Sequence, residues 1–296
     1  MYNLIYITNL PSFYKINLFN RIGKHRKLLV VFTHEKSVQR NADFYKGERE
    51  FEFISIANKS TIGKIGFIFN LLKNKPYQHL IIAGWDQLVL WLAAFISPRN
   101  KNGVVVESSI LESKTTGIRG LVKKIFLSHI SKAYVSGKSQ ADLCTALGFK
   151  DQLIITKGVG IFNIKPQPNF KASTSVKNFI YVGRLSPEKN LLFLIETFNL
   201  FPELILNVVG FGPQEIFLKS IAKQNIIFHG AVPNNELYKF YLQNDVFVLP
   251  STSETWGMVV EEAFNNGLPV IVSDKVGCAE EIINDSNGII FKLSEP

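Results

Sequence analysis

Short apolar runs alternate with longer amphipathic stretches along almost the whole chain. Runs rich in valine, isoleucine and leucine are typical of buried strands, and apolar residues at helical spacing are typical of helices packed on a sheet. In the first half we expect strands at 4–8, 28–32, 80–83, 104–106, 133–135 and 153–156. Helical patterns lie between them at 14–22, 62–72, 88–96 and 118–130. This alternation predicts βαβ units and a parallel sheet.

The alternation is interrupted once and then resumes. Residues 164–176 contain two prolines and a run of serine and threonine, which indicates a linker. Beyond it we expect strands at 179–182, 204–209, 226–229, 246–249, 269–272 and 289–291, and helices at 191–198, 214–223, 235–241 and 257–266. The pattern predicts an α/β protein with two Rossmann-like, doubly wound domains at 1–165 and 178–296, joined by a linker at 166–177. Such sheets bind ligands outside the carboxyl ends of their strands, so we expect the domains to face a central cleft.

Charge is distributed unevenly between the two halves. Residues 1–175 contain 25 basic and 10 acidic side chains, whereas residues 176–296 contain 8 and 14. This surplus in the first half indicates an anionic partner. Because the basic stretches are also apolar and no nucleic-acid motif is present, we expect an anionic membrane surface and no nucleic acid. The helices at 62–75 and 118–130 combine cations with apolar stripes, although such stripes also occur on core-facing helices.

Several classes of protein do not fit the sequence. The two cysteines, Cys144 and Cys278, lie far apart and are expected to be reduced thiols. The longest apolar run, 88–96, is much shorter than the ~20 residues of a spanning helix, and the first residues read as a strand rather than a signal peptide. Five histidines show no metal spacing. We therefore expect a cytoplasmic, metal-free protein, at most peripheral on the inner face of a membrane.

Two cations lie in the segment after the first predicted strand of the second half. Arg184 and Lys189 precede the helix that is expected to begin near Asn190. Free N–H groups and the helix dipole favour an anion at such a place, and two fixed cations could neutralise a diphosphate. A solvated basic loop would explain the same residues. Gly210 and Gly212 follow the next strand and would let a ligand approach the backbone closely, although Gly-x-Gly turns are common.

The segment 249–264 carries two glutamates eight residues apart. Glu254 is predicted in the loop after a strand, and Glu262 in the helix that follows. The backbone N–H groups of Gly257 and Met258 are expected to point into the same space. One carboxylate can therefore lie beside a sugar while the other accepts hydrogen bonds from ribose hydroxyls. Glu261 is expected to point elsewhere, because neighbours on a helix are ~100° apart.

These segments together resemble the retaining nucleotide-sugar glycosyltransferases with a Glu-x7-Glu motif, the group 1 family with the GT-B fold. The resemblance covers most of residues 178–292 and rests on GRLSPEKN, VGFGP, HGAVPNNEL, LPSTSETWGMVVEEAFNNGLPVIVSD and GCAEEIINDSNGIIF. It implies that Arg184 and Lys189 hold the donor diphosphate, with Glu254 near the donor sugar and Glu262 on the ribose. It also implies that Ala231 and Val232 lie near the base.

The resemblance is weaker elsewhere. Relatives often have a histidine facing the sugar after the strand at 104–106, where this chain has Glu107, so we take Glu107 as a second catalytic candidate beside a capping or buried role. Cys278 and Glu280 replace the glycine and proline usual before the acidic residue that Glu281 matches. The chain also ends soon after the last predicted strand, so we expect a short C-terminal part.

The resemblance implies transfer of a sugar from a nucleoside diphosphate donor to a glycan or lipid-linked acceptor with retention of configuration, in surface polysaccharide synthesis. No metal is expected, because no DxD-type pair is present and lysine and arginine can take its place. Two alternatives stay open: a sugar-nucleotide epimerase, and a catalytically silent nucleotide-sugar-binding protein. A Rossmann dehydrogenase fits poorly, because G-x-G-x-x-G does not follow the first strand.

Overall fold

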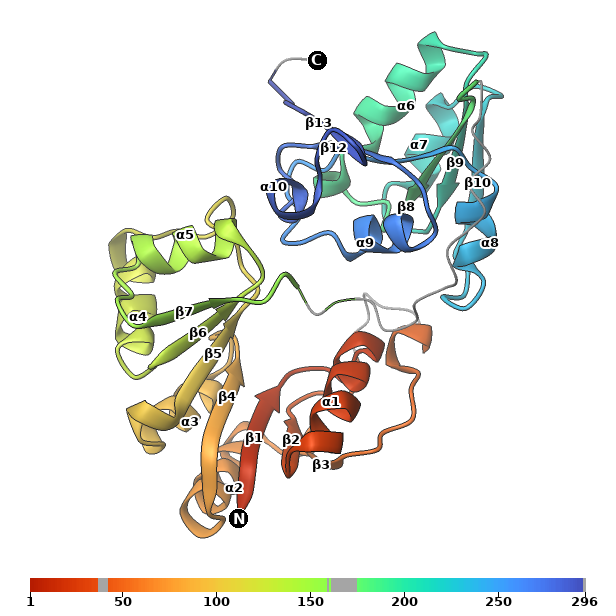
Figure 1. The fold of residues 1–296 in the computed structure, drawn as a ribbon. Helices are drawn as coiled ribbons and strands as arrows, with labels where there is room; N and C mark the ends of the chain where they lie inside the picture. The colour runs from red at the N-terminus through yellow and green to blue at the C-terminus, as the bar shows by residue number, and fades with distance from the viewer. Residues whose placement is uncertain (37–41, 159, 161–174, 295–296) are drawn as a thin grey trace. The chain divides into compact units, whose positions relative to one another are not determined.

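The chain forms two compact units, Met1–Val159 (unit 1) and Gly160–Pro296 (unit 2). This computed structural model describes residues 1–36, 42–158, 160 and 175–294. Figure 1 shows unit 1 in red to green and unit 2 in green to blue. The predicted linker at 166–177 lies mostly outside the described residues, so the predicted domain bounds stay a prediction, as does the cleft between the domains.

Unit 1 contains a seven-stranded parallel sheet in the order β3-β2-β1-β4-β5-β6-β7. Its strands are β1 (Tyr2–Thr8), β2 (Leu28–Phe32), β3 (Glu52–Ser55), β4 (Tyr77–Ala83), β5 (Asn102–Val106), β6 (Lys132–Val135) and β7 (Gln152–Ile155). Its helices are α1 (Phe13–His25), α2 (Thr61–Asn74), α3 (Leu88–Ile96), α4 (Gly117–Leu127) and α5 (Lys138–Ala146), with short 3-10 turns at Ala42–Tyr45 and Arg99–Lys101. The predicted βαβ arrangement is confirmed.

Helices cover both faces of this sheet, because successive strand residues point to opposite sides. Tyr6 of β1 packs with Phe19 of α1 on one face. Its neighbours Ile5 and Ile7 belong to a larger core on the other face, to which α2, α3, α4 and α5 contribute. Nearly continuous apolar strands are what a parallel sheet buried on both faces requires.

Unit 2 contains a six-stranded parallel sheet in the order β10-β9-β8-β11-β12-β13. Its strands are β8 (Asn178–Val182), β9 (Ile205–Val209), β10 (Ile226–Gly230), β11 (Val246–Leu249), β12 (Val270–Ser273) and β13 (Gly288–Phe291). Its helices are α6 (Leu191–Leu200), α7 (Glu215–Ile221), α8 (Leu237–Leu242), α9 (Met258–Asn265) and α10 (Ala279–Ile282), with a 3-10 turn at Pro187–Lys189. The expected fold class, two Rossmann-like α/β domains, is confirmed.

Strand order reverses direction once in each sheet, and this is where doubly wound sheets bind ligands. In unit 1 the reversal lies between β1 and β4, and in unit 2 between β8 and β11. The loops that leave the carboxyl ends of these strands are therefore the first place to look for chemistry.

Candidate functional site

The residues expected to bind the donor follow four neighbouring strands of unit 2. Arg184 and Lys189 follow β8, Gly210 and Gly212 follow β9, Ala231 and Val232 follow β10, and Glu254, Gly257 and Met258 follow β11. Because these strands are parallel neighbours, their carboxyl ends share one edge of the sheet. The structure therefore brings the loops carrying these residues to one edge, on both sides of the reversal.

The segment after β8 is held by its own polar contacts. Arg184 Nη2 lies 3.0 Å from Glu188 Oε1, and the Ser186 hydroxyl donates to the same oxygen at 2.7 Å. Burial opposes ionisation of Glu188, but these hydrogen bonds and the Arg184 charge hold its pKa below the usual value. The acid thus stays charged and fixes Arg184 at the sheet edge.

Lys189 and Glu254 form an ion pair that joins the loops after β8 and β11. Their side chains are only 12% and 16% exposed. The Thr252 amide also donates to the Glu188 carbonyl at 2.9 Å, which ties the two loops together a second time. The pair lies across the strand reversal, so a predicted phosphate-binding cation and a predicted sugar-facing carboxylate contact one another there.

Close backbone packing explains why glycine stands at positions 210 and 212. A Cβ at Gly210 would lie 1.8 Å from the Gly183 carbonyl oxygen, and one at Gly212 would lie 2.4 Å from that of Leu185. Gly210 also has φ +137°, which side chains rarely adopt. The loops after β8 and β9 therefore pack backbone against backbone, and the ligand-binding role of these glycines stays a prediction.

The loop carrying Glu254 is supported by the segment before α10. The Glu254 carbonyl accepts from the Gly277 amide at 2.8 Å, and the Trp256 carbonyl accepts from the Cys278 amide at 2.8 Å. A Cβ at Gly277 would lie 2.0 Å from the Thr255 carbonyl oxygen. Cys278 is buried, and its Sγ lies 3.8 Å from the Gly257 carbonyl oxygen, so the thiol packs inside this loop.

The neighbouring acids of α9 take different partners. Glu262 accepts a hydrogen bond from the Tyr241 hydroxyl of α8 at 3.2 Å, and Glu261 accepts one from the Trp256 indole. Burial raises the pKa of Glu262 to about 7, and burial also raises that of Glu261. Gly257 caps α9 with φ +98°, and Met258 begins the helix.

Unit 1 provides a second cluster at the carboxyl edge of its sheet. Lys15 of α1 is buried, and its Nζ lies 3.2 Å from the Thr8 hydroxyl, 3.2 Å from Asn9 Oδ1 and 3.2 Å from Glu107 Oε1. The ion pair with Glu107, whose own carboxylate is exposed, raises the pKa of Lys15 although burial alone would lower it. Glu107 is thus a positioned carboxylate at this edge, and its place relative to Glu254 stays a prediction.

Sequence reasoning missed Lys15, Glu188 and Tyr241. Lys15 had a signal, because it stands beside Ile16 on the core-facing side of an amphipathic helix. Glu188 lies inside the GRLSPEKN motif, but no role was assigned to it from the sequence. Tyr241 had no signal, because its contact with Glu262 is made only by the tertiary fold.

Comparison with known proteins bears on unit 2 most directly. Residues 164–296 match the family described as glycosyl transferases group 1. Sulfoquinovosyl transferase SQD2 of Arabidopsis thaliana is 38% identical over 118 residues, which cover 40% of this chain and 23% of that protein. The O-antigen biosynthesis glycosyltransferase WbnH of Escherichia coli is 31% identical over 167 residues, which cover 54% of this chain and 46% of that protein. The chain thus spans about a quarter to a half of these curated relatives.

Solved structures extend the likeness to both units. Anabaena HepE, in complex with UDP and glucose, superposes with a TM-score of 0.70 at 15% identity, over 99% of this chain and 86% of that one. At this identity the likeness concerns the fold, which is that of GT-B glycosyltransferases. The family model for group 1 glycosyltransferases thus matches the C-terminal unit, where the sequence motifs predicted the resemblance. The comparisons give no support to the epimerase alternative.

Two further features of the described residues bear on the expected metal-free protein without a membrane-spanning helix. No helix there combines the length and apolar character needed to cross a bilayer. No group of three histidine, cysteine, aspartate or glutamate side chains there could hold a metal ion. The expectation of a metal-free reaction stays a prediction.

Proposed function

We propose that the protein transfers a glycosyl group from a nucleoside diphosphate sugar to a hydroxyl of a glycan or lipid-linked acceptor, with retention of configuration. One observation carries this proposal: Lys189 and Glu254 contact one another across the strand reversal of a unit that matches the group 1 glycosyltransferases, beside the Arg184–Glu188 pair. HepE, which has the same fold, binds UDP and glucose, and this supports a nucleotide-sugar donor. The O-antigen biosynthesis relative supports an acceptor in surface polysaccharide synthesis.

The site must stabilise the negative charge that develops on the departing diphosphate. The bond between the sugar C1 and the phosphate oxygen breaks as the acceptor oxygen bonds to C1 on the same face, and the acceptor proton passes to the departing phosphate. Negative charge grows on the diphosphate, where Arg184 and Lys189 are already fixed by Glu188 and Glu254. Preorganised cations stabilise such charge without a reorganisation cost, and they supply the charge that a metal ion would otherwise provide.

The two catalytic candidates have separate parts in this proposal. Glu254 lies beside the reacting sugar and holds Lys189, while Glu262 accepts the ribose hydroxyls. Glu107 belongs to unit 1, which we assign to the acceptor, and Lys15 keeps its carboxylate in place. We place the reaction at the cytoplasmic face of a membrane, where a lipid-linked acceptor would lie; the positive surplus of the first half supports this.

Arg184→Ala tests the diphosphate assignment. The change removes charge-assisted hydrogen bonds of about 1.5–3 kcal/mol, so the affinity for UDP and for a transferable UDP-sugar should fall about 10- to 150-fold in calorimetric titration. Lys219→Ala is the matched control, because Lys219 forms a similar ion pair with Glu215, four positions before it on the exposed surface of α7. Equal donor affinity in wild type and Arg184→Ala would contradict the assignment. Transfer of labelled sugar separates an enzyme from a silent binding protein.

A further inference from the structure

Helix α4 turns an apolar stripe away from the core of unit 1. Ile118, Leu121, Val122 and Ile125 recur at the spacing of one helix face. Ile118 is 82% exposed, and the other three are between 43% and 58% exposed. Of the buried residues of the same helix, Gly120 and Leu127 lie on the opposite side, and Phe126 lies at the border of the stripe, next to Val122. The stripe is therefore additional to the face that packs on the sheet.

Helix α2, which showed the same combination in the sequence, behaves differently. It buries Ile68, Leu71 and Leu72 in the core of unit 1. Its exposed large apolar residues, Ile62 and Phe69, stand seven positions apart with Gly66 between them. The two helices therefore differ: most of the apolar stripe of α2 is packed in the core, whereas the apolar stripe of α4 is exposed.

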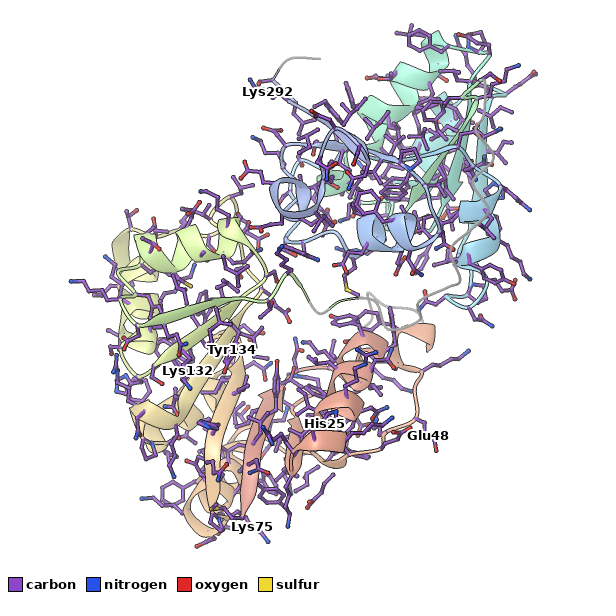
Figure 2. The ribbon with its side chains drawn as sticks, in the orientation of Figure 1. His25, Glu48, Lys75, Lys132, Tyr134 and Lys292 are labelled. Carbon is purple, nitrogen blue, oxygen red and sulfur yellow. The ribbon has the colours of Figure 1, made fainter. Side chains whose placement is uncertain are left out.

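The surroundings of the α4 stripe are cationic. Residues 113–141 contain six lysines and arginines and no acidic residue. Lys114, Arg119 and Lys124 are exposed and make no ion pair with another residue that the structure describes. Lys132, labelled in Figure 2, begins β6 directly after the helix. The Lys123 side chain has partners within unit 1: its Nζ lies over the Trp85 ring and donates to the Lys114 carbonyl at 3.2 Å.

We propose that this face of α4 docks on an anionic lipid bilayer. A helix with an apolar stripe between cations lies in the plane of the membrane interface, with its apolar residues among the acyl chains and its cations at the anionic headgroups. An eleven-residue helix is too short to span the bilayer, so the attachment is peripheral. Charge complementarity selects the partner: a purely apolar contact with another protein would not need an acid-free stretch of 29 residues.

The position of α4 connects this surface with the proposed function, on which this part of the inference rests. The chain enters α4 from the loop that follows β5 and carries Glu107. A docked α4 would therefore hold the carboxyl edge of the unit 1 sheet near the bilayer surface. A lipid-linked acceptor could then reach Glu107 without leaving the membrane.

Co-sedimentation of the full chain with vesicles tests the surface. Binding is expected with phosphatidylglycerol vesicles at low salt, with little binding to phosphatidylcholine vesicles, and it should weaken as salt is raised. Arg119→Gln with Lys124→Gln should lower the partition coefficient on anionic vesicles about 30-fold. Leu121→Gln with Ile125→Gln should lower it by about tenfold or more, because both side chains lose their apolar contact with the acyl chains.

The matched control is Ile62→Gln with Phe69→Gln, which removes two exposed apolar residues from α2 and should leave vesicle binding unchanged. Circular dichroism melting checks that each variant is folded. Wild-type vesicle binding by both folded α4 variants would overturn the proposal. So would a lipid-independent dimer that the α4 changes dissociate, because the face would then join two copies. Vesicle binding needs no donor, so this surface and glycosyl transfer can fail independently.

Discussion

At the scale of single residues, each unit carries a lysine–glutamate pair that links segments which follow strands on either side of its strand reversal. Lys189 and Glu254 are both mostly buried, whereas Lys15 is buried and Glu107 is exposed. Removing one partner of a buried pair leaves a charge without compensation, which typically costs 3–5 kcal/mol. This cost applies to the Lys189–Glu254 pair, and each of the two pairs fixes a charged group at the carboxyl edge of its sheet.

The raised pKa of Glu262 makes the free energy of unfolding depend on pH. Its pKa is raised to about 7 in the folded chain, from an ordinary value near 4.5. Between these values the folded chain keeps the proton and the unfolded chain has lost it, so the free energy of unfolding falls as pH rises. Between pH 4.5 and 7.5 the free energy of unfolding should therefore fall by about 2–3 kcal/mol more in the wild type than in Glu262→Gln, as measured by urea denaturation. Identical pH profiles for the wild type and the variant would contradict the raised pKa of Glu262.

At the scale of elements, the strands were the most predictable part of the fold. Those at 28–32 and 246–249 match β2 and β11 at both ends, because continuous apolar runs are what a sheet covered on both faces needs. Sequence reasoning missed β3, a short edge strand with exposed residues, and α5, whose polar surface hides its amphipathic pattern. It also could not choose the buried side of α4, because apolar residues occur on both sides of that helix.

The candidate site was predictable as far as its motifs extend. Arg184, Lys189 and Glu254 could be assigned to loops after strands, and the structure places those loops at one sheet edge. Their contacts with one another could not be predicted, because Lys189 and Glu254 are 65 residues apart in the chain. The tight packing at Gly210 was also invisible, since it depends on the carbonyl of a different loop.

Gly210→Ala tests whether the loops after β8 and β9 form one rigid element. The new Cβ would overlap the Gly183 carbonyl at 1.8 Å, so we expect a loss of about 1–3 kcal/mol in the free energy of unfolding. Gly66→Ala in α2 is the control: its Cβ would meet nothing within 4 Å, and alanine should stabilise the helix by roughly 0.5–1 kcal/mol. Equal stability of the two variants would show that the loops yield to the clash.

At the scale of the whole molecule, the chain combines two compact units with separate hydrophobic cores. Unit 2 carries the candidate donor site, and unit 1 carries Glu107 and the α4 surface. Units with their own cores can unfold and exchange amide hydrogens independently. A ligand then stabilises chiefly the unit that it contacts.

Hydrogen exchange with two separate probes tests this division of labour. Saturating UDP, at about 100 times its dissociation constant, should slow exchange in unit 2 by the equivalent of roughly 2.7 kcal/mol, most clearly at 183–190 and 254–260. It should leave α4 nearly unchanged, because α4 is built on the other core. Phosphatidylglycerol vesicles should do the reverse, slowing exchange at Gly117–Leu127 and sparing the donor loops. The division would be wrong if UDP slowed exchange in α4 as strongly as in the donor loops. If each probe acts on its own unit, donor binding and membrane attachment are separate functions of the two halves, and they meet only when sugar is transferred.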